Sequence, residues 1–280
     1  MYYIYHYTKA NTFEKIISSK TFYLMDHQGM EDKNEIKWLF GLVEKAIEDL
    51  FLEKLTSKEY ERLQYFKRAY IKIMKNRIAI KNHYMICFSQ KENIVNQWEL
   101  YADNHKGIAI VFNLNFSEEL IGLISKAQSN TENNRPSTQK IGYEYVVYDD
   151  GNEIKNMIRD ILKQEYYDAN HYVVFINELQ SFIKHPQYYK EDEIRIIYTP
   201  ENTKNFEINR QYNNILKRIS NKKIIGNRKY YELDFSCIHN SLLIPKVIRG
   251  KECEMSYEKV RKILDENGFK DTSIELGLIP

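Results

Sequence analysis

The chain has 280 residues, of which 43% are hydrophobic and 29% are charged, and its formal net charge at pH 7 is +2. This composition excludes a wholly disordered chain, and the near-neutral charge excludes a basic surface spread over the whole molecule, although it leaves room for a local basic patch. No run of about eighteen apolar residues is present, which argues against a membrane span, and the first residues lack the layout of a secretory signal.

The beginning of the chain predicts a strand, a helix and a second strand. Alternating residues predict a strand over Tyr2–Thr8, and Phe22–Leu24 predicts another. Asn11 or Thr12 would cap the short helix between them. The polar stretch Asp26–Asn34, which contains a glycine, predicts a loop.

Two longer helices follow. Within Glu35–Leu55, apolar side chains recur at spacings of three and four, which predicts an amphipathic helix. Thr56 and Glu59 have the spacing of a capping box and predict a second helix that reaches Ile80. We expect the two helices to form an antiparallel hairpin, inserted between strands over residues 35–80.

The rest of the chain predicts further strands and helices without a regular order. Apolar runs predict strands at Tyr84–Ser89, Ile108–Phe112, Tyr143–Tyr148, Ile194–Tyr198, Lys229–Phe235 and Leu242–Ile248. Helical spacing occurs in Ile94–Ala102, Ile154–Ile183 and Ser256–Asn267, and a break near Ala169-Asn170 is an open alternative within the second of these. Gln128–Gln139 predicts a polar surface loop. We therefore predict an α+β fold with mixed, mostly antiparallel sheets, in a single domain of residues 1–280.

Glu191, Glu193 and Arg195 stand at alternate positions where the chain enters the Ile194–Tyr198 strand. Side chains alternate between the faces of a strand, so we expect all three to share one face. Two carboxylates and a guanidinium on one face cost repulsion and desolvation unless they bind something. The alternative is a solvated edge strand whose charges discourage aggregation.

Other polar residues stand at the ends of predicted strands. His6, Tyr7 and Thr8 end the first strand, and Ser89 ends the Tyr84–Ser89 strand. Taken singly, a terminal histidine is ordinarily a satisfied or solvent-exposed residue, and a serine at a strand end is ordinarily the start of a loop. Their occurrence together with the paired glutamates makes a site at converging strand ends a hypothesis.

The segment around Trp98 is also distinctive. On a helix, Trp98 shares a face with Tyr101 or Ala102, which predicts core packing. Lys106 and Gly107 then predict a turn in which glycine allows a positive φ. A phosphate contact from Lys106 has no further support in the sequence.

Several chemistries are disfavoured. Cys87, Cys237 and Cys253 are odd in number and widely spaced, which predicts neither a disulfide framework nor a zinc site and indicates a reducing cytoplasm. No glycine-rich phosphate loop, His-Glu-x-x-His motif or Gly-x-Ser-x-Gly elbow is present. We therefore expect no metal, no P-loop and no serine hydrolase, and we expect Cys87 to pack rather than react.

Several of these motifs together resemble one bacterial family, the domain-of-unknown-function family 2971. The motifs are Tyr5-His6-Tyr7-Thr8, Asp32-x-x-Glu35, Cys87-Phe88-Ser89, Trp98-x-x-Tyr101-Ala102 with Lys106-Gly107, and Glu191-x-Glu193-x-Arg195. The resemblance extends over roughly residues 1–250. The chain departs from it at residues 31–35, where the family's usual Asn-Asp-Pro-Phe-Glu is replaced by Glu-Asp-Lys-Asn-Glu.

That family is similar, more distantly, to ADP-ribosyltransferases. These enzymes carry a His or Arg on the first strand, a Ser or Tyr on a middle strand and a Glu on a late strand. The similarity implies an ADP-ribosyltransferase-like core and makes His6, Ser89 and Glu193 the corresponding candidates. It also implies NAD as a substrate, without a metal.

The similarity assigns a role to each candidate around bound NAD. Glu193 would bind the 2′-hydroxyl of the nicotinamide ribose and stabilise an oxocarbenium-like transition state. His6 would hold a ribose hydroxyl, with Thr8 beside it in the cofactor site, Tyr7 would stack on nicotinamide, and Ser89 would support Glu193.

The similarity gives the remaining two candidates, Glu191 and Arg195, roles toward the acceptor and toward the negative charges of the site. Glu191 would orient or deprotonate the acceptor nucleophile. Arg195 would neutralise the pair of glutamates or contact the pyrophosphate.

The function implied is an NAD-dependent mono-ADP-ribosyltransferase acting on a macromolecular acceptor, protein or nucleic acid. The resemblance also implies a cytoplasmic bacterial toxin or antiviral defence effector, with an antitoxin or regulatory partner and no membrane. Two alternatives stay open: a non-catalytic module that binds a nucleotide or nucleic acid, and an NAD glycohydrolase with water as acceptor.

Overall fold

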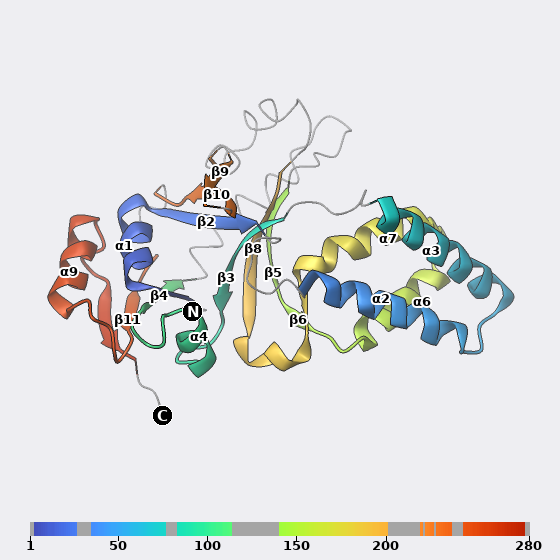
Figure 1. The fold of residues 1–280 in the computed structure, drawn as a ribbon, viewed down its shortest axis with the longest axis horizontal. Helices are drawn as coiled ribbons and strands as arrows, with labels where there is room; N and C mark the ends of the chain where they lie inside the picture. Colours follow the sequence, from blue (N-terminus) through green and yellow to red (C-terminus); the bar gives the residue numbers. More distant parts are fainter. Residues whose placement is uncertain are drawn as a thin grey trace. The chain divides into compact units, whose positions relative to one another are not determined.

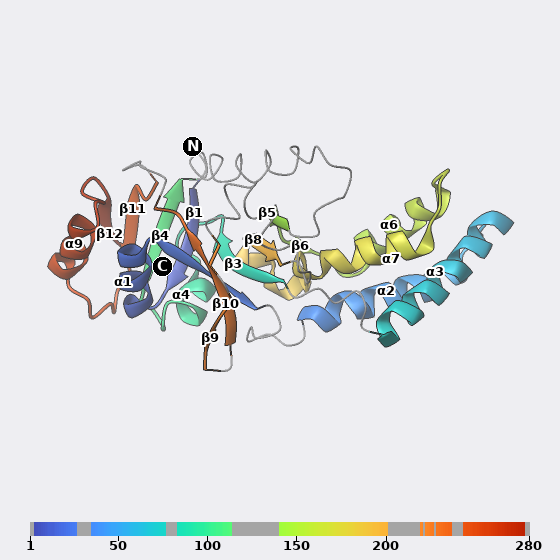
Figure 2. The same ribbon diagram turned by 90° about the horizontal axis from the view of Figure 1, so that it is seen from above.

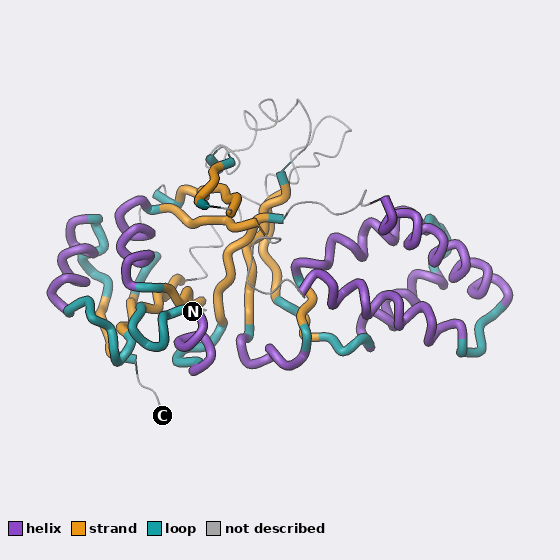
Figure 3. Tube along the Cα trace, viewed as in Figure 1, coloured by secondary structure: helices purple, strands orange, loops and turns teal. Residues whose placement is uncertain are grey.

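The computed structural model describes residues 3–26, 35–76, 83–113, 140–200, 219–220, 222–226, 228–236 and 243–277. The chain divides into two compact units, which are described separately. One unit comprises Met1–Gly29, His83–Tyr145 and Lys190–Pro280, and is called the sheet unit below. The other comprises Met30–Asn82 and Val146–Tyr189, and is called the helical unit. Figure 3 shows which parts of the trace are helix and which are strand.

Ten strands of the sheet unit form one sheet within the described part of the chain. The strands are β1 (Tyr3–Thr8), β2 (Thr21–Asp26), β3 (Tyr84–Ser89), β4 (Ile108–Asn113), β5 (Lys140–Tyr145), β8 (Glu193–Thr199), β9 (Lys223–Ile225), β10 (Arg228–Asp234), β11 (Lys246–Arg249) and β12 (Ser273–Leu276). The order β12-β11-β4-β1-β3-β2-β10-β9 forms the main path, and β8 joins β3 to β5. The β11–β12 pair is parallel and the other pairs are antiparallel.

The strand β3 is where the sheet branches. It pairs with β8 along its whole length, from Tyr84 to Ser89. Its end pairs with β1 only through Tyr5 and Ser89, whereas its beginning pairs with β2 through Met85 and Tyr84. The two neighbours β1 and β2 therefore meet β3 at opposite ends. The end that carries Ser89 is the end where β1 and β8 come together.

Two cores cover the two faces of this sheet. Helices α1 (Ala10–Ser19) and α9 (Tyr257–Glu266) lie side by side and cover one face, which is called the α1–α9 face (Figures 1 and 2). Alternate strand residues pack there with the apolar side chains of both helices. The short helix α4 (Val95–Leu100) packs on the other face, the α4 face, through Trp98. Which face a strand residue occupies follows from alternation and register.

The ends of two helices show one prediction from local sequence that is correct and one that is wrong. Helix α9 is capped by Ser256, whose side chain accepts a hydrogen bond from the backbone of Lys259, and Gly268 follows it with φ 87°. Helix α1 begins one residue after Lys9, which makes no side-chain cap. The prediction that Asn11 or Thr12 caps it is therefore wrong.

The helical unit contains α2 (Glu35–Phe51), α3 (Ser57–Asn76), α6 (Asn152–Lys163) and α7 (Ala169–Glu178), followed by the short helix η2 (Leu179–Ser181). Helix α2 packs mainly on α6 and α3 mainly on α7 around one apolar core. The predicted capping box is confirmed: Thr56 Oγ1 accepts from the Glu59 backbone, and Glu59 Oε2 accepts from the Thr56 backbone. A two-stranded parallel sheet, β6 (Val147–Tyr148) with β7 (Ile183–Lys184), completes the unit.

The α+β class with a mixed, mostly antiparallel sheet is confirmed. The two predicted helices near residues 35–80 form, but they share their core with helices of residues 146–189, which the predicted insertion did not include. The single domain and the ADP-ribosyltransferase-like core stay predictions. The loops predicted at Asp26–Asn34 and Gln128–Gln139, and the helix predicted beyond Asn76, lie wholly or mainly outside the described residues.

The predicted helical region Ile154–Ile183 is broken close to the predicted place, because α6 ends at Lys163 and α7 begins at Ala169. Two predicted strand boundaries differ from the structure. The predicted strand Tyr143–Tyr148 is divided between β5 and β6, and the predicted strand Leu242–Ile248 begins only at Lys246. In the part of the chain that the structure describes, no helix has the length and apolar character required to cross a membrane.

Gly107 is required for close packing and not for a positive φ, which corrects the prediction. The positive φ angles belong to Asp103, Asn104 and His105, at 51°, 51° and 70°. A Cβ atom at Gly107 would lie 2.2 Å from the carbonyl oxygen of Thr8. The turn before β4 therefore approaches the end of β1 too closely for any side chain.

The variant Gly107→Ala is expected to lower the free energy of unfolding by at least about 2 kcal/mol, because the backbone must move to admit the methyl group. Gly41→Ala is the matched control, since nothing lies within 4 Å of its added Cβ in the middle of α2. That variant is expected to stabilise the protein by about 0.5–1 kcal/mol. Urea unfolding of both variants measures the difference, and equal effects would contradict the close approach.

Candidate functional site

One row of directly opposed residues crosses five strands of the sheet. The register pairs Lys246 with Val111, Val111 with Tyr5, Tyr5 with Ser89, and Ser89 with Glu193. Directly opposed residues project to the same face and neighbouring strands lie about 4.8 Å apart. All five side chains therefore lie on the α4 face. The row brings two predicted site residues, Ser89 and Glu193, next to each other.

Glu193 and Arg195 form a buried ion pair on this face. The Nε and Nη2 atoms of Arg195 both donate to Oε2 of Glu193, at 3.0 and 2.6 Å. The side chains of Arg195 and Glu193 are 1% and 3% exposed. The prediction that they share a strand face is confirmed. Each partner compensates a charge that would otherwise be isolated in the protein interior.

Glu191 does not belong to the strand. It is the last residue of the 3-10 helix η3 (Pro186–Glu191), and Asp192, with a left-handed φ of 48°, separates it from β8. The prediction that Glu191 stands on one strand with Glu193 is therefore wrong, because the left-handed residue ends the alternation. The structure instead places the Glu191 carbonyl 2.8 Å from Ser89 Oγ, which donates a hydrogen bond to it.

Two short segments are joined beside Ser89. The backbone N–H of Gln90 donates to the Asp192 carbonyl at 2.8 Å, and Gln90 Nε2 donates to Asp192 Oδ1 at 3.0 Å. Lys91 Nζ lies 3.0 Å from Asp192 Oδ2. The backbone N–H of Lys91 also donates to Ser89 Oγ at 3.2 Å. These contacts hold the segment after β3 to the segment before β8.

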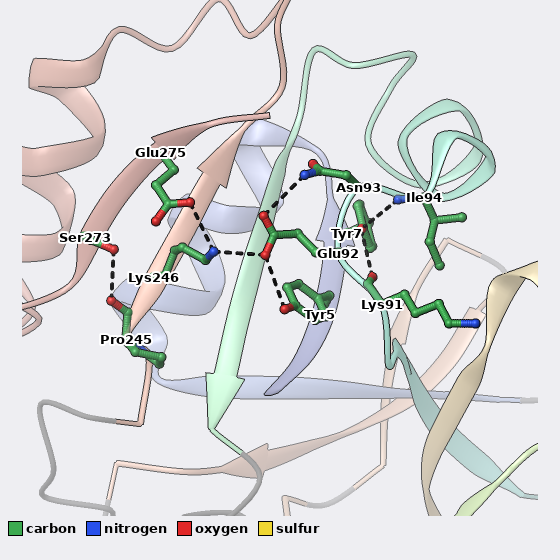
Figure 4. A network of polar contacts seen from close by, with 10 residues as sticks. All are labelled: Tyr5, Tyr7, Lys91, Glu92, Asn93, Ile94, Pro245, Lys246, Ser273 and Glu275. Carbon is green, nitrogen blue, oxygen red and sulfur yellow. Dashed lines mark hydrogen bonds and ion pairs between the residues drawn. The ribbon is translucent and has the colours of Figure 1, made fainter. Parts of the chain in front are cut away.

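Tyr7 anchors the continuation of the same segment (Figure 4). Its hydroxyl donates to the Lys91 carbonyl at 3.2 Å and accepts from the backbone N–H of Ile94 at 3.3 Å. Its ring meets the indole of Trp98 edge-on, at 5.1 Å between centroids. Burial raises the pKa of Tyr7 above its ordinary value, so the phenol is neutral near pH 7. Stacking of Tyr7 on nicotinamide stays a prediction.

Glu92 lies between Tyr5 and Lys246 (Figure 4). The Tyr5 hydroxyl donates to Glu92 Oε2 at 3.3 Å, and Lys246 Nζ lies 3.0 Å from the same oxygen and 3.1 Å from Glu275 Oε2. Burial, followed by the charge of Glu92, raises the pKa of Tyr5. Burial by itself would lower the pKa of Lys246, but hydrogen bonds from Lys246 to both carboxylates raise it above its ordinary value.

His6 and Thr8 project to the other side of the sheet. They are paired with two isoleucines of β4 that belong to the α1–α9 core. The row that contains Ser89 and Glu193 lies on the α4 face. The prediction that His6 and Ser89 line one cleft with the late glutamates is therefore wrong as to the direction of the His6 side chain. The cause is the two-residue period of a strand.

The imidazole of His6 joins β1 to β3. Its Nδ1–H donates to the carbonyl of Cys87 at 3.0 Å, and its ring packs on Phe88 at 5.5 Å between centroids. Burial lowers the pKa of His6 below its ordinary value, while the hydrogen bond to Cys87 acts in the opposite direction. The ring is therefore neutral at pH 7 and donates through Nδ1.

The free energy of unfolding is expected to fall as the pH is lowered below about 6.5, partly because of His6. In that range unfolded His6 takes up a proton that folded His6 resists, so stability rises with pH. His6→Asn keeps a side-chain N–H for the Cys87 carbonyl and does not titrate. Urea unfolding at about pH 7 and pH 5.5 is expected to show a smaller loss in this variant than in wild type. Equal losses would contradict the lowered pKa.

Trp98 and Ala102 are fully buried, whereas Tyr101 is 39% exposed. The prediction that the Trp98 face packs a core is confirmed, and Ala102 is the partner on that face. The indole also stacks on His105, with 25° between the ring planes. This small core holds α4 against the face that carries the row.

Tyr5 and Lys246 in the row, and Glu92 beside it, were not among the predicted site residues. Tyr5 alternates with Tyr7, which is a signal that both share a face. Glu92 lies in a polar run after a strand and carries no such signal. Lys246 follows Pro245 at the start of an apolar run, and only the register of β11 on β4 brings it near Tyr5.

Among the described residues, no group of three or more His, Cys, Asp or Glu side chains is arranged to hold a metal ion. Cys87 and Cys253 form no disulfide within the described part of the chain, and Cys237 lies outside it. Asp32 of the Asp32-x-x-Glu35 motif also lies outside them.

Comparison with known families yields one match. Residues 97–196 match the family described as "Protein of unknown function (DUF2971)". The matched range contains the motif of Glu191, Glu193 and Arg195, and it supports the resemblance to that family. It is shorter than the predicted 1–250 and leaves out the motifs around His6 and Ser89. No curated protein and no solved structure matches the chain.

Proposed function

We propose that the protein is an NAD-dependent mono-ADP-ribosyltransferase that acts on a macromolecular acceptor. The observation that carries this proposal is the row on the α4 face. It brings Glu193 next to Ser89 on the neighbouring strand, while Ser89 donates a hydrogen bond to the backbone carbonyl of Glu191. One hydroxyl, the side chain of Glu193 and the main chain of Glu191 are thus close together where β3 ends and β8 begins.

The chemistry requires a negative charge beside the nicotinamide ribose. In the reaction, the bond between C1′ of the ribose and the nicotinamide nitrogen breaks, and nicotinamide leaves with the electron pair. Positive charge then develops on the ribose, where a fixed carboxylate stabilises it and binds the 2′-hydroxyl. Glu193 is the candidate for this role, because its ion pair with Arg195 fixes the position of its carboxylate.

The second half of the reaction needs a base. The acceptor nucleophile forms a bond to C1′ and gives its proton to a carboxylate, for which Glu191 is the candidate. Its carbonyl is fixed by Ser89, so the main chain at Glu191 is held in position. Arg195 holds Glu193 in place in this scheme, which leaves contact with the pyrophosphate to other groups.

His6 takes a different part from the one that the family resemblance implies. Its imidazole is engaged with the Cys87 carbonyl, where it fastens β1 to β3 next to the Tyr5–Ser89 pair. We propose that His6 supports the site from the α1–α9 face. A direct contact with the ribose would require the ring to leave that carbonyl.

Incubation of the purified protein with NAD tests the proposal, with nicotinamide release and labelled ADP-ribose on macromolecules as the two readouts. Release together with a labelled macromolecule is the expected result. Release without label would instead make the protein an NAD glycohydrolase. No release above a protein-free control, with protein and nucleic-acid acceptors present, would leave the non-catalytic binding module.

A role as a cytoplasmic toxin or antiviral defence effector, with an antitoxin or regulatory partner, is a further proposal that rests on the family resemblance. The labelled macromolecule from the same experiment would identify the acceptor that such a role requires. Its identity as protein or nucleic acid follows from the sensitivity of the label to protease or nuclease.

A further inference from the structure

Asp192 is the residue between the two candidate glutamates, and all its polar groups that face the β3 end are engaged. Its carbonyl accepts from the Gln90 backbone, its Oδ1 accepts from Gln90 Nε2, and its Oδ2 pairs with Lys91. No other residue between η3 and β8 separates Glu191 from Glu193.

The backbone of Asp192 also sets the direction of the chain. Its φ of 48° is left-handed, a conformation that Asn and Asp adopt more readily than other residues with a side chain. Because of this turn, Glu191 leaves the strand alternation and its carbonyl reaches Ser89. The direction of the main chain from Glu191 to Glu193 therefore depends on the left-handed turn at Asp192.

We propose that Asp192 is a positioning residue that sets the partition between transfer to a macromolecule and transfer to water. This inference rests on the proposed function. Glu193 acts on the ribose, and Glu191 acts on the acceptor. A change at Asp192 that displaces Glu191 while β8 still holds Glu193 therefore impairs transfer more than hydrolysis.

The contacts explain why the two glutamates respond differently. Glu193 is fixed by pairing of β8 with β3 and by two hydrogen bonds from Arg195. Glu191 lies before the strand, and its main-chain carbonyl accepts a hydrogen bond from Ser89. Loss of the Asp192 side chain removes the hydrogen bond from Gln90 Nε2 and the ion pair with Lys91. The backbone hydrogen bond from Gln90 and the pairing of β8 with β3 stay in place.

The test compares Asp192→Ala with Asp192→Asn. Alanine removes both side-chain acceptors and disfavours the left-handed backbone. Asparagine keeps an acceptor for Gln90 and tolerates the left-handed backbone. Asp192→Ala is expected to lower the ratio of transfer to hydrolysis about 10-fold, with the KM for NAD changed less than about 3-fold, because misplaced groups lose rate more than binding. Asp192→Asn is expected to stay within about twofold of wild type.

Gln90→Leu removes the hydrogen bond between Gln90 Nε2 and Asp192 Oδ1 by changing the donor. It is the test variant if Asp192→Ala does not fold. It is expected to lower the ratio in the same direction, and the double variant is expected to be no worse than the more impaired single variant. If wild type transfers ADP-ribose and a folded Asp192→Ala variant has an unchanged ratio of transfer to hydrolysis, the inference is overturned. If Asp192→Ala does not fold, an unchanged ratio in Gln90→Leu overturns it in the same way. A wild type that releases no nicotinamide, or that labels nothing, would instead overturn the proposed function and this inference with it.

Discussion

Replacing Glu193 by Gln is expected to lower the rate of nicotinamide release from NAD by about 100-fold or more. Removal of one fixed electrostatic partner of a transition state costs about 100- to 1000-fold in rate. Glutamine keeps the length of the side chain and an oxygen that accepts from Arg195, but it lacks the negative charge. The measurement is nicotinamide release per folded protein, with the folded fraction taken from a thermal unfolding curve.

Glu232→Gln is the matched control. Glu232 lies on β10 of the same sheet and pairs with Lys223 at the surface. The same change of side chain there is expected to leave the rate of nicotinamide release within about twofold, since an exposed pair contributes little. Equal rates of nicotinamide release for Glu193→Gln and wild type would show that Glu193 takes no part in the reaction.

The variant Arg195→Met is expected to lower the free energy of unfolding by about 3–5 kcal/mol. The carboxylate of Glu193 would then lie in the protein interior without the guanidinium that compensates its charge. Methionine fills much of the volume of the arginine stem, so loss of packing is a smaller part of the effect. Urea unfolding at pH 7 measures the change.

Arg159→Met provides the comparison at the surface. Arg159 donates to both carboxylate oxygens of Glu53, but the two side chains are 31% and 32% exposed. Its loss is expected to cost no more than about 1 kcal/mol. If Arg195→Met cost as little as Arg159→Met, the pair at β8 would not be the buried interaction described above.

The elements of the fold could largely be predicted because their signals are local. The capping box at Thr56 and Glu59 involves residues three positions apart, and the Ser256 cap likewise lies within one helical turn. The branching of the sheet at β3 could not be predicted, because its pairings with β1, β2 and β8 join segments far apart in the sequence. The grouping of α2 and α3 with α6 and α7 depends on the same kind of distant contact.

The candidate site could be predicted only in part. The pairing of Glu193 with Arg195 follows from the two-residue period of one strand. The place of Glu191 does not, because a single left-handed residue, Asp192, interrupts that period. The direction of the His6 side chain was predictable from the sequence, because neighbouring residues on a strand project to opposite faces and His6 follows Tyr5.

The row from Lys246 to Glu193 depends on register across five strands and has no signal within any one segment. The place of Tyr5 and Lys246 in this row therefore follows only from the strand register of the folded sheet. The same holds for Glu92, which lies between them.

A crystal structure with NAD bound tests the central claim most directly, because Glu193 is 3% exposed and its carboxylate must become accessible for NAD to reach it. The account predicts the nicotinamide ribose on the α4 face, with its 2′-hydroxyl within about 3 Å of a carboxylate oxygen of Glu193. A nucleotide on the face of His6, or one that leaves Glu193 enclosed with Arg195, would contradict it.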